Sequence, residues 1–406
     1  MTDTVTPSRI AGRVRRIKPS PSTAAADRAS ELKRQGQSIV SLVVGEPDFD
    51  TPAHIREAAT AAMNRGATRY TLMAGTVELR QAIVAKLERE NGLVYGMNEI
   101  FVANGAKSAI YGLFAVTLEP GDEVIVPAPY WVSYPDMVLA NEGVPVTVPC
   151  PEAEGFKLTP ARLDAAITPR TRWLLLNSPS NPTGAAYSVA EYKALAEVLR
   201  RHPHVLVMTD DIYEHIRFDG ARTPHLLNAA PDLRERTAAV NGVSKTYAMT
   251  GFRIGWVAAP RDIIVALDTY FSQSAGNCCS VSQAAAAAAL SGDQRFVAEC
   301  REVYRQRRDR TAALVNAIPG LSCRVPDGAF YLYVNCAGLI GKTTPAGKRL
   351  ANDSDVVMDL LERAGVALVA GTAYGLSPYF RVSIATSMDN LEEGCRRIAA
   401  AVAALR

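Results

Sequence analysis

The stretch NGVSKTYAMTGFRIGW, residues 241–256, is small and apolar for most of its length but carries two cations, Lys245 and Arg253. It contains no acidic residue, so neither cation has a carboxylate partner close by in the sequence. The apolar runs Ala238–Val240 and Ile254–Ala258 at its two ends predict buried strands. We therefore expect a lysine and an arginine to lie together at the end of a buried sheet.

The chain around this stretch alternates short apolar runs with amphipathic segments, which is the pattern of a mostly parallel sheet covered by helices. The other predicted strands of this sheet are Ile100–Ala103, Glu123–Val126, Trp173–Leu176 and Val205–Met208. The predicted helices are Ala53–Arg65, Val77–Glu90, Lys107–Thr117, Val189–Arg200 and a long helix near Gln294–Ile318. The predicted fold class is therefore α/β.

The C-terminal part of the chain predicts a second, smaller α/β domain. Ala329–Val334 and Phe380–Ala385 have the pattern of strands, and Asn390–Leu405 has that of a final helix. The residues before position 51 are too few to bury a core of their own, so we expect them to pack on this domain. The expected division is an arm at 1–50 that joins the small domain, a large domain at 51–314 and the small domain at 315–406.

The composition is that of a soluble globular protein, with 48% hydrophobic residues, 21% charged residues and a net charge of +3 over 406 residues. No basic run suggests a nucleic-acid or membrane-surface partner, and no apolar run approaches the ~18 residues of a membrane helix. The seven cysteines form no C-x-x-C pair. We therefore expect no metal site, reduced thiols and a cytoplasmic protein without a secretory signal.

Polar groups follow four of the predicted strands, and ligands of open α/β sheets bind beyond the carboxyl ends of the strands. These groups are Asn104–Lys107, Asn177–Asn181, Asp210–Asp211 and Ser244–Lys245. A sequestered lysine loses its proton readily, and a neutral amine is the nucleophile that forms a Schiff base with an aldehyde. Lys245 is therefore the candidate catalytic residue and points to an aldehyde cofactor.

An anion site is predicted beside this lysine. Gly105, Ala106 and Lys107 open a helix directly after a strand, where backbone N–H groups and the helix dipole favour an anion. Arg253 adds a planar donor that suits a phosphate. Together these residues suggest a phosphorylated ligand.

Four further side chains suit a pyridine ring. Asp210 could keep a ring nitrogen protonated, or it could cap the next helix. Asn181 and Tyr213 could donate to a phenolic oxygen, although Tyr213 could also be a core tyrosine. Trp131 could stack on the ring, or it could be a core aromatic residue.

Arg381 lies inside an apolar strand, where a buried arginine needs an anion partner. A substrate carboxylate would serve as a bidentate partner, and the alternative is a structural salt bridge. No acidic residue is near Arg381 in the sequence, which favours the substrate.

Several motifs occur in order along the chain. They are GEPDFDTP (45–52), Tyr70 before a G-x-x-E-L-R segment, GAK (105–107), PYWVSYP (129–135), NSPSNPTG (177–184), TDDIYEH (209–215), SKTYAMTGFRIGW (244–256) and RVSIATS (381–387). Over nearly the whole chain this order resembles the class I, fold type I aminotransferases that depend on pyridoxal phosphate. The resemblance is to the subgroup that holds bacterial aspartate and prephenate aminotransferases, and it implies a large domain with a mostly parallel seven-stranded sheet.

The resemblance implies a role for each matching residue. Lys245 holds the cofactor as a Schiff base, Asp210 pairs with the pyridine nitrogen, Trp131 stacks on the ring, and Asn181 and Tyr213 bind the phenolic oxygen. The implied phosphate ligands are Gly105, Ala106, Ser244, Arg253 and, from the neighbouring subunit of a homodimer with shared active sites, Tyr70. The implied substrate-binding residues are Gly45, Trp131, Asn181, Arg381 and, for a second carboxylate, Lys107, Ser20 and Ser22.

The chain departs from the acidic-substrate members at positions near the substrate. Leu72, Ile384, Asn277–Cys279 and Pro21–Ser22 replace residues that are usual there. We expect an acidic amino acid, aspartate or glutamate, with 2-oxoglutarate, oxaloacetate or prephenate as the acceptor. The alternatives are a specialised biosynthetic amino acid, a β-elimination with the same cofactor, and a non-catalytic regulator that binds the cofactor.

Overall fold

The computed structural model describes residues 9–406, and its centre is a sheet of seven strands in the order β2-β8-β7-β6-β5-β3-β4. All neighbouring strands are parallel except at β8, which runs antiparallel to both β2 and β7. The strands are β2 (Ile100–Ala103), β3 (Glu123–Ala128), β4 (Val144–Pro149), β5 (Thr171–Asn177), β6 (Leu206–Asp210), β7 (Thr237–Gly242) and β8 (Gly255–Ala258). The predicted α/β fold with a mostly parallel seven-stranded sheet is confirmed.

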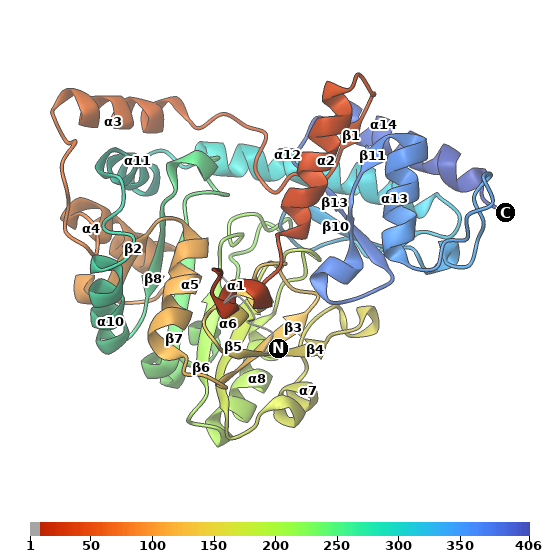
Figure 1. The fold of residues 1–406 in the computed structure, drawn as a ribbon. Helices are drawn as coiled ribbons and strands as arrows, with labels where there is room; N and C mark the ends of the chain where they lie inside the picture. The colour runs from red at the N-terminus through yellow and green to blue at the C-terminus, as the bar shows by residue number, and fades with distance from the viewer. Residues whose placement is uncertain (1–8) are drawn as a thin grey trace, which may run out of the picture.

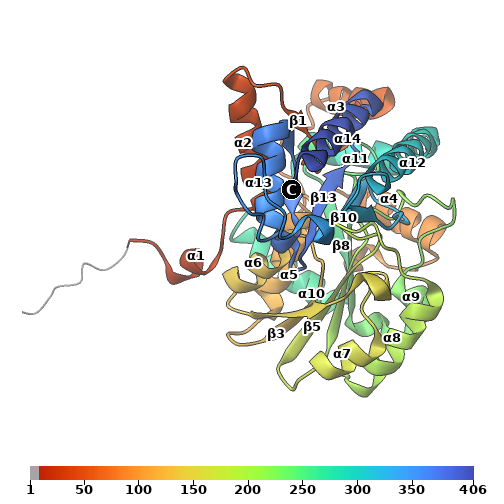
Figure 2. The same cartoon turned by 90° about the vertical axis from the view of Figure 1, so that its right-hand side faces the viewer.

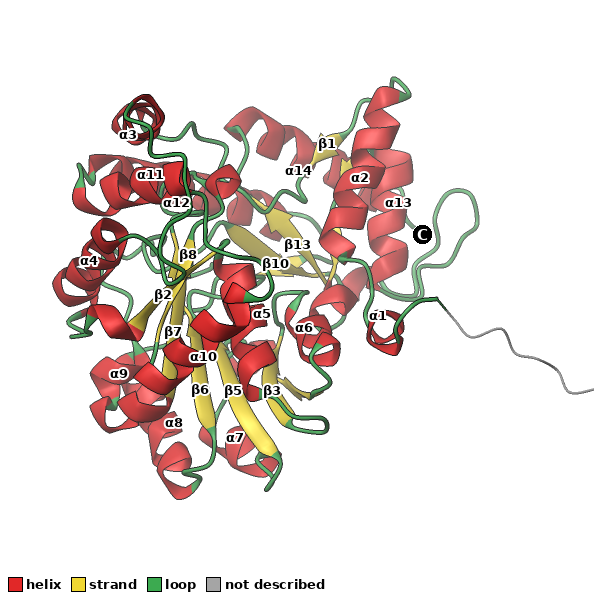
Figure 3. Cartoon of the chain, turned by 60° about the vertical axis from the view of Figure 1, so that its left-hand side comes forward, coloured by secondary structure: helices red, strands yellow, loops and turns green. Residues whose placement is uncertain are grey.

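Helices cover both faces of this sheet, as Figures 1 and 3 show. Trp173 and Leu175 of β5 pack into one core, which includes residues of α5 (Ala106–Thr117), α6 (Tyr134–Ala140) and α10 (Arg261–Ser272). Leu174 and Leu176 of the same strand pack into the opposite core, with residues of α3 (Ala53–Asn64), α4 (Val77–Lys86), α8 (Val189–Arg201) and α11 (Ser280–Ser291). Because successive side chains point to opposite faces, a strand buried on both sides is a continuous apolar run.

A second sheet lies in the C-terminal part, with the antiparallel order β12-β13-β10-β9. Its strands are β9 (Ser322–Cys323), β10 (Tyr331–Asn335), β12 (Val369–Ala370) and β13 (Tyr379–Ser383). The strand β1 (Val40–Ser41) of the N-terminal arm pairs in parallel with β11 (Val366–Ala367). In Figure 2 the arm helix α2 lies next to α13, so the start of the chain is part of the C-terminal layer.

A long helix, α12, connects the part of the chain that forms the large sheet to the part that forms most of the small sheet. The helices are α1 (Gly12–Arg16), α2 (Pro21–Arg34), α3 (Ala53–Asn64), α4 (Val77–Lys86), α5 (Ala106–Thr117), α6 (Tyr134–Ala140), α7 (Pro160–Ala166), α8 (Val189–Arg201), α9 (Leu226–Ala229), α10 (Arg261–Ser272), α11 (Ser280–Ser291), α12 (Arg295–Asn316), α13 (Asp353–Ala364) and α14 (Met388–Ala403). No helix between residues 9 and 406 is long and apolar enough to cross a membrane.

The predicted elements are present, with one difference at a helix end. The predicted helix Val77–Glu90 is α-helical only to Lys86 and continues as a π-helical turn, η1 (Leu87–Asn91). Gly92 ends this turn in the left-handed conformation, with φ of 66°. A π-turn shifts the side chains that follow it around the helix axis, and here it brings Glu90 and Asn91 toward the buried side chain of Lys86.

Candidate active site

A cavity of about 530 Å³ lies at the carboxyl ends of the central strands, between the large sheet and the C-terminal layer. Most of the predicted site residues line it: Ser20, Ser22, Gly45, Ala106, Lys107, Trp131, Asn181, Asp210, Tyr213, Ser244, Lys245, Arg253 and Arg381. Two do not. Gly105 lies directly behind Arg253, and Tyr70 is 96% exposed on the surface.

Lys245 follows β7 and projects into the cavity. Its Nζ donates a hydrogen bond of 2.6 Å to the carbonyl oxygen of Gly45. Burial, helped by Arg253 and Arg381 and opposed by Glu46 and Asp210, lowers the pKa of Lys245 to about 8. A lysine with this pKa is partly neutral near pH 7–8, and the neutral amine is the form that reacts with an aldehyde.

Arg253 and the first turn of α5 form an anion-binding corner. Arg253 has a left-handed backbone, with φ of 55°, and its guanidinium donates to the carbonyl oxygens of Thr250 at 2.9 Å and Asn104 at 3.3 Å. Among residues 9–406 it has no carboxylate partner. Gly105 precedes α5 with φ of 85°, and a Cβ there would lie 2.4 Å from Nη2 of Arg253. The guanidinium therefore packs against the start of the helix and leaves its charge available to an anion.

Asp210 ends β6 and is almost fully buried, at 4% exposure. Its Oδ2 accepts a hydrogen bond of 2.6 Å from the hydroxyl of Tyr134. Burial raises the pKa of Asp210 to about 6 although Tyr134 lowers it. Asp210 caps no helix, since the next helix in the chain, α9, begins only at Leu226. A buried carboxylate at the floor of a cavity suits a protonated ring nitrogen better than a structural cap.

Arg381 is 2% exposed on β13 and has no ion pair within the described chain. Nη1 donates to Oδ1 of Asn181 at 3.1 Å and Nη2 to the carbonyl oxygen of Val43 at 2.6 Å, while Nε has no partner. The guanidinium lies 4.3 Å from the centre of the Tyr331 ring. The structural salt bridge that the sequence left open is therefore wrong, and the charge of Arg381 is free to bind an anion in the cavity.

The remaining predicted residues lie around these groups. Nζ of Lys107 is 4.9 Å from the centre of the Trp131 ring, and burial together with Arg253 lowers the pKa of this lysine. Tyr213 is buried, and its hydroxyl lies 2.9 Å from that of Tyr331. Asn181 is held by Arg381, as described above. Lys107, Trp131, Tyr213 and Asn181 therefore all line one cavity, and Tyr213 and Trp131 also pack against core residues.

The sequence did not indicate several polar residues that line the cavity, among them Tyr134, Tyr331, Glu46 and Thr250. Tyr134 contacts Asp210, and Tyr331 contacts Tyr213. Glu46 accepts a hydrogen bond of 2.7 Å from the hydroxyl of Thr250. Tyr134 and Glu46 stand inside quoted motifs, but their partners are distant in the sequence, so the motifs alone did not indicate these contacts.

The donor set fits pyridoxal 5'-phosphate. An amine with a lowered pKa suits the aldehyde, the corner of Arg253 and α5 suits the phosphate, and buried Asp210 suits the ring nitrogen. The unpartnered Nε of Arg381 leaves a donor for a substrate carboxylate in the same cavity. The cavity volume is within the range of ordinary cofactor sites.

The family model described as aminotransferase class I and II matches residues 37–398. The aspartate aminotransferase of Rhizobium meliloti (strain 1021) is 54% identical over 374 residues, which are 92% of this chain and 91% of that protein. The aspartate/prephenate aminotransferase of Cereibacter sphaeroides is 50% identical over 390 residues, 96% of this chain and 98% of that protein. A crystal structure of the aspartate aminotransferase from Rhizobium meliloti has a TM-score of 0.96 at 51% identity and covers 98% of this chain and 100% of that one. The chain therefore belongs to the class I and II aminotransferases, and it is a fold type I enzyme that depends on pyridoxal phosphate.

Proposed function

We propose that this aminotransferase moves an amino group between aspartate or glutamate and a 2-oxoacid, which is 2-oxoglutarate, oxaloacetate or prephenate. The observation that carries the proposal is the pair of cations at the substrate side of the cavity. Arg381 has no ion pair in the described chain, and Lys107 has no carboxylate partner there either. An acidic substrate has two carboxylates and would neutralise both. The names of the similar proteins support the same substrates.

In this proposal different side chains bind different parts of the cofactor. Arg253, Ser244, Gly105 and Ala106 bind the phosphate, and Lys107 adds its positive charge to that corner. Asp210 holds the ring nitrogen, with Asn181 and Tyr213 at the phenolic oxygen and Trp131 against the ring. Bound there, pyridoxal phosphate supplies an aldehyde and an electron-withdrawing ring.

The catalytic role falls to Lys245, which takes the proton from the substrate Cα. Burial of Lys245 keeps part of the amine neutral at neutral pH, as this step requires. Arg381 binds the α-carboxylate of the substrate beside Gly45 and thereby fixes which bond at the substrate Cα faces Lys245. Lys107, Ser20 and Ser22 bind the second carboxylate, and Trp131 and Asn181 also contact the substrate.

The proposal includes a cytoplasmic homodimer with shared active sites. Tyr70 is fully exposed in the single chain and follows α3, so it is free to reach a neighbouring subunit. The pairing of β1 with β11 supports the assignment of the arm at 1–50 to a small domain completed by 315–406, beside a large domain at 51–314.

The test is a panel of amino donors and oxoacids with the wild-type enzyme and Lys107→Ala. We expect transfer from aspartate to 2-oxoglutarate with formation of glutamate, and a loss of roughly 10- to 100-fold in kcat/KM for acidic donors in Lys107→Ala. Neutral donors should change little, and Lys193→Ala, at an exposed helical position, serves as the control.

Two results would contradict the proposal. An equal loss for all donors would limit Lys107 to the phosphate corner or the fold and would remove it from the second carboxylate. Release of pyruvate and ammonia from an alanine that carries a leaving group on Cβ, with no glutamate formed from aspartate and 2-oxoglutarate, would replace amino transfer by elimination.

A further inference from the structure

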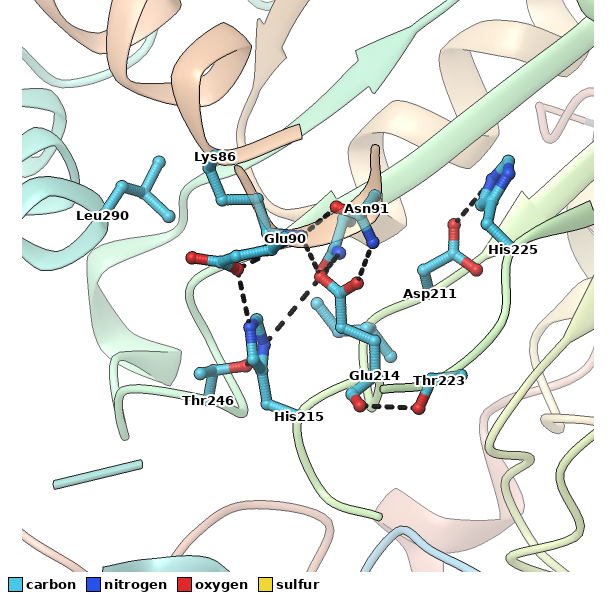
Figure 4. Close-up of polar contacts among 12 residues, drawn as sticks. Lys86, Glu90, Asn91, Asp211, Glu214, His215, Thr223, His225, Thr246 and Leu290 are labelled. Atoms are coloured by element: carbon cyan, nitrogen blue, oxygen red, sulfur yellow. Dashed lines mark hydrogen bonds and ion pairs between the residues drawn. The ribbon is translucent and has the colours of Figure 1, made fainter. Parts of the chain in front are cut away.

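A network of buried and partly buried charged and polar side chains contacts Thr246, the residue that follows Lys245 (Figure 4). Its centre is Lys86 at the end of α4, which is 1% exposed. Nζ of Lys86 contacts Oε1 of Glu214 and donates to Oδ1 of Asn91 at 2.7 Å. Asn91 in turn donates to Oε2 of Glu214 at 2.6 Å. Glu214 would have a raised pKa from burial alone, but Lys86 and His215 lower it to about 2.

The network holds the loop of Lys245 at two points. Nδ2 of Asn241, at the end of β7, donates to Oε1 of Glu214 at 2.5 Å, and Oδ1 of Asn241 accepts from the backbone N–H of Gly242 at 2.7 Å. Nδ1 of His215 lies 3.1 Å from the hydroxyl of Thr246, the residue after Lys245. The chain from 241 to 246 is thus tied at both ends to the same buried charges.

His215 joins the loop to the acidic side of the network. Its Nε2 lies 2.8 Å from Oε2 of Glu90. The pKa of Glu90 is lowered overall, since His215 and Lys86 together outweigh the effect of burial. An ionised carboxylate only accepts hydrogen bonds, so Nε2 donates to Glu90, and Nδ1 shares its hydrogen bond with the Thr246 hydroxyl, which can donate or accept.

The cluster is not arranged as a metal centre. Glu90, Glu214 and His215 present oxygen and nitrogen atoms within 4.8 Å of one another. The ammonium of Lys86 already lies among them, at 3.6 Å from Glu90 and in contact with Glu214. The lysine therefore supplies the positive charge that a cation would bring, and the site serves the surrounding chain.

We propose that His215, through its hydrogen bond to Thr246, is a positioning residue that holds Lys245 in line with the substrate Cα. The Lys86–Glu214 pair stabilises this arrangement, because Glu214 directly precedes His215 in the chain and also binds the end of β7. Lys245 directly precedes Thr246 in the sequence, and Tyr213 directly precedes Glu214. The network therefore fixes the backbone beside two residues that line the cavity. The proposal rests on the catalytic role of Lys245 proposed above.

Two substitutions of His215 separate its two hydrogen bonds. The amide of His215→Asn reaches about as far as Nδ1 and keeps the bond to Thr246, whereas that of His215→Gln reaches about as far as Nε2 and keeps only the bond to Glu90. Thr246→Val removes the hydroxyl at nearly constant volume, and Thr246→Ser restores it. The enzyme is assayed with bound pyridoxal phosphate, and thermal unfolding is recorded for every variant.

We expect His215→Gln and Thr246→Val to lower kcat by roughly 10-fold, with KM changed by less than about twofold. The pH midpoint of the visible absorbance of the cofactor-bound enzyme should shift by about half a unit or more in the same two variants. His215→Asn and Thr246→Ser should remain within about twofold of wild type. The split between kcat and KM and the shifted midpoint are changes that a general loss of stability would not produce.

The result that overturns the proposal is a fall in unfolding temperature in all four variants with an unchanged absorbance midpoint and equal kcat. Equal loss of activity in His215→Asn and His215→Gln would also overturn it, because the Thr246 contact would then not be the one that matters. Failure of the catalytic role of Lys245 is seen separately: wild-type enzyme reduced with borohydride in the presence of the cofactor would show no covalent adduct at Lys245.

Discussion

Four cationic side chains line the cavity, and this excess of positive charge explains why the site can bind anions. Lys107, Lys245, Arg253 and Arg381 face it, while Asp210 and Glu46 are the acidic residues there. Mutual repulsion contributes to the lowered pKa values of Lys107 and Lys245, after burial as the largest cause. A phosphate and one or two carboxylates would relieve this repulsion, so the site is built for anions at positions that are separated from one another.

The hydroxyl of Tyr134 should determine how well Asp210 serves the ring nitrogen. Burial already raises the pKa of Asp210 to about 6, and the bond from Tyr134 opposes this rise because it stabilises the carboxylate. In Tyr134→Phe the pKa of Asp210 should rise further, so a larger fraction is protonated near neutral pH. We expect the dissociation constant of pyridoxal phosphate to increase by roughly 10-fold at pH 6–7.

The sign of the pH dependence distinguishes this effect from a packing defect. Asp210 is ionised above its pKa, so the defect of Tyr134→Phe should shrink as the pH rises to 8–9 and grow as it falls toward 6. The measurement is a fluorescence titration of the apoenzyme with cofactor at several pH values. A defect that is equal at all pH values would mean that the tyrosine contributes only packing, and Tyr192→Phe, at a buried tyrosine that makes no hydrogen bond to Asp210, is the control.

At the scale of elements, the turn between β2 and α5 needs a glycine for two reasons, its backbone conformation and its close contact with Arg253. Gly105 has φ of 85°, and a Cβ would meet Nη2 of Arg253 at 2.4 Å. Gly121, before β3, has a similar φ of 93° but open space around it. Gly105→Ala and Gly121→Ala should therefore both lose about 1–2 kcal/mol in the free energy of unfolding from backbone strain. Only Gly105→Ala should also weaken the binding of pyridoxal phosphate, because it displaces Arg253.

Urea unfolding and cofactor titration of both variants check this expectation. If Gly121→Ala weakened cofactor binding as much as Gly105→Ala, the loss would come from general strain and the corner of Arg253 and α5 would not be the phosphate site. If Gly105→Ala bound pyridoxal phosphate with wild-type affinity, the corner of Arg253 and α5 would likewise not be the phosphate site.

The sequence predicted the elements well and the contacts between them poorly. Apolar runs located β2 and β5–β8 within one or two residues, and the rule for strand ends then brought Asp210 and Lys245 to one edge. Hydrogen bonds between distant segments have no such signal. Tyr134 meets Asp210 across 76 positions, and Lys86 meets Glu214 across 128. The π-turn at Leu87–Asn91 also escaped prediction, since its apolar spacing continues that of α4.

At the scale of the whole molecule, one predicted site residue remains apart from the cavity. Tyr70 is 96% exposed, and Leu72 and Met63, which are close to it in the sequence, are exposed as well. Several exposed apolar side chains on one segment are typical of an interface. They agree with the proposed homodimer, in which Tyr70 completes the phosphate site of the partner subunit.

Purified heterodimers of tagged variant subunits test this arrangement. One subunit carries Lys245→Ala and the other Tyr70→Ala, and activity is measured at a cofactor concentration that leaves both homodimeric variants inactive. If Tyr70 acts across the interface, the Tyr70→Ala subunit keeps its Lys245 and receives an intact Tyr70 from its partner, so the heterodimer should have about half of the wild-type activity. A heterodimer with both substitutions in one subunit should then be inactive, because the intact subunit lacks the tyrosine of its partner. If Tyr70 serves its own chain, the two results are exchanged, and monomeric protein at assay concentration would reject the shared site altogether.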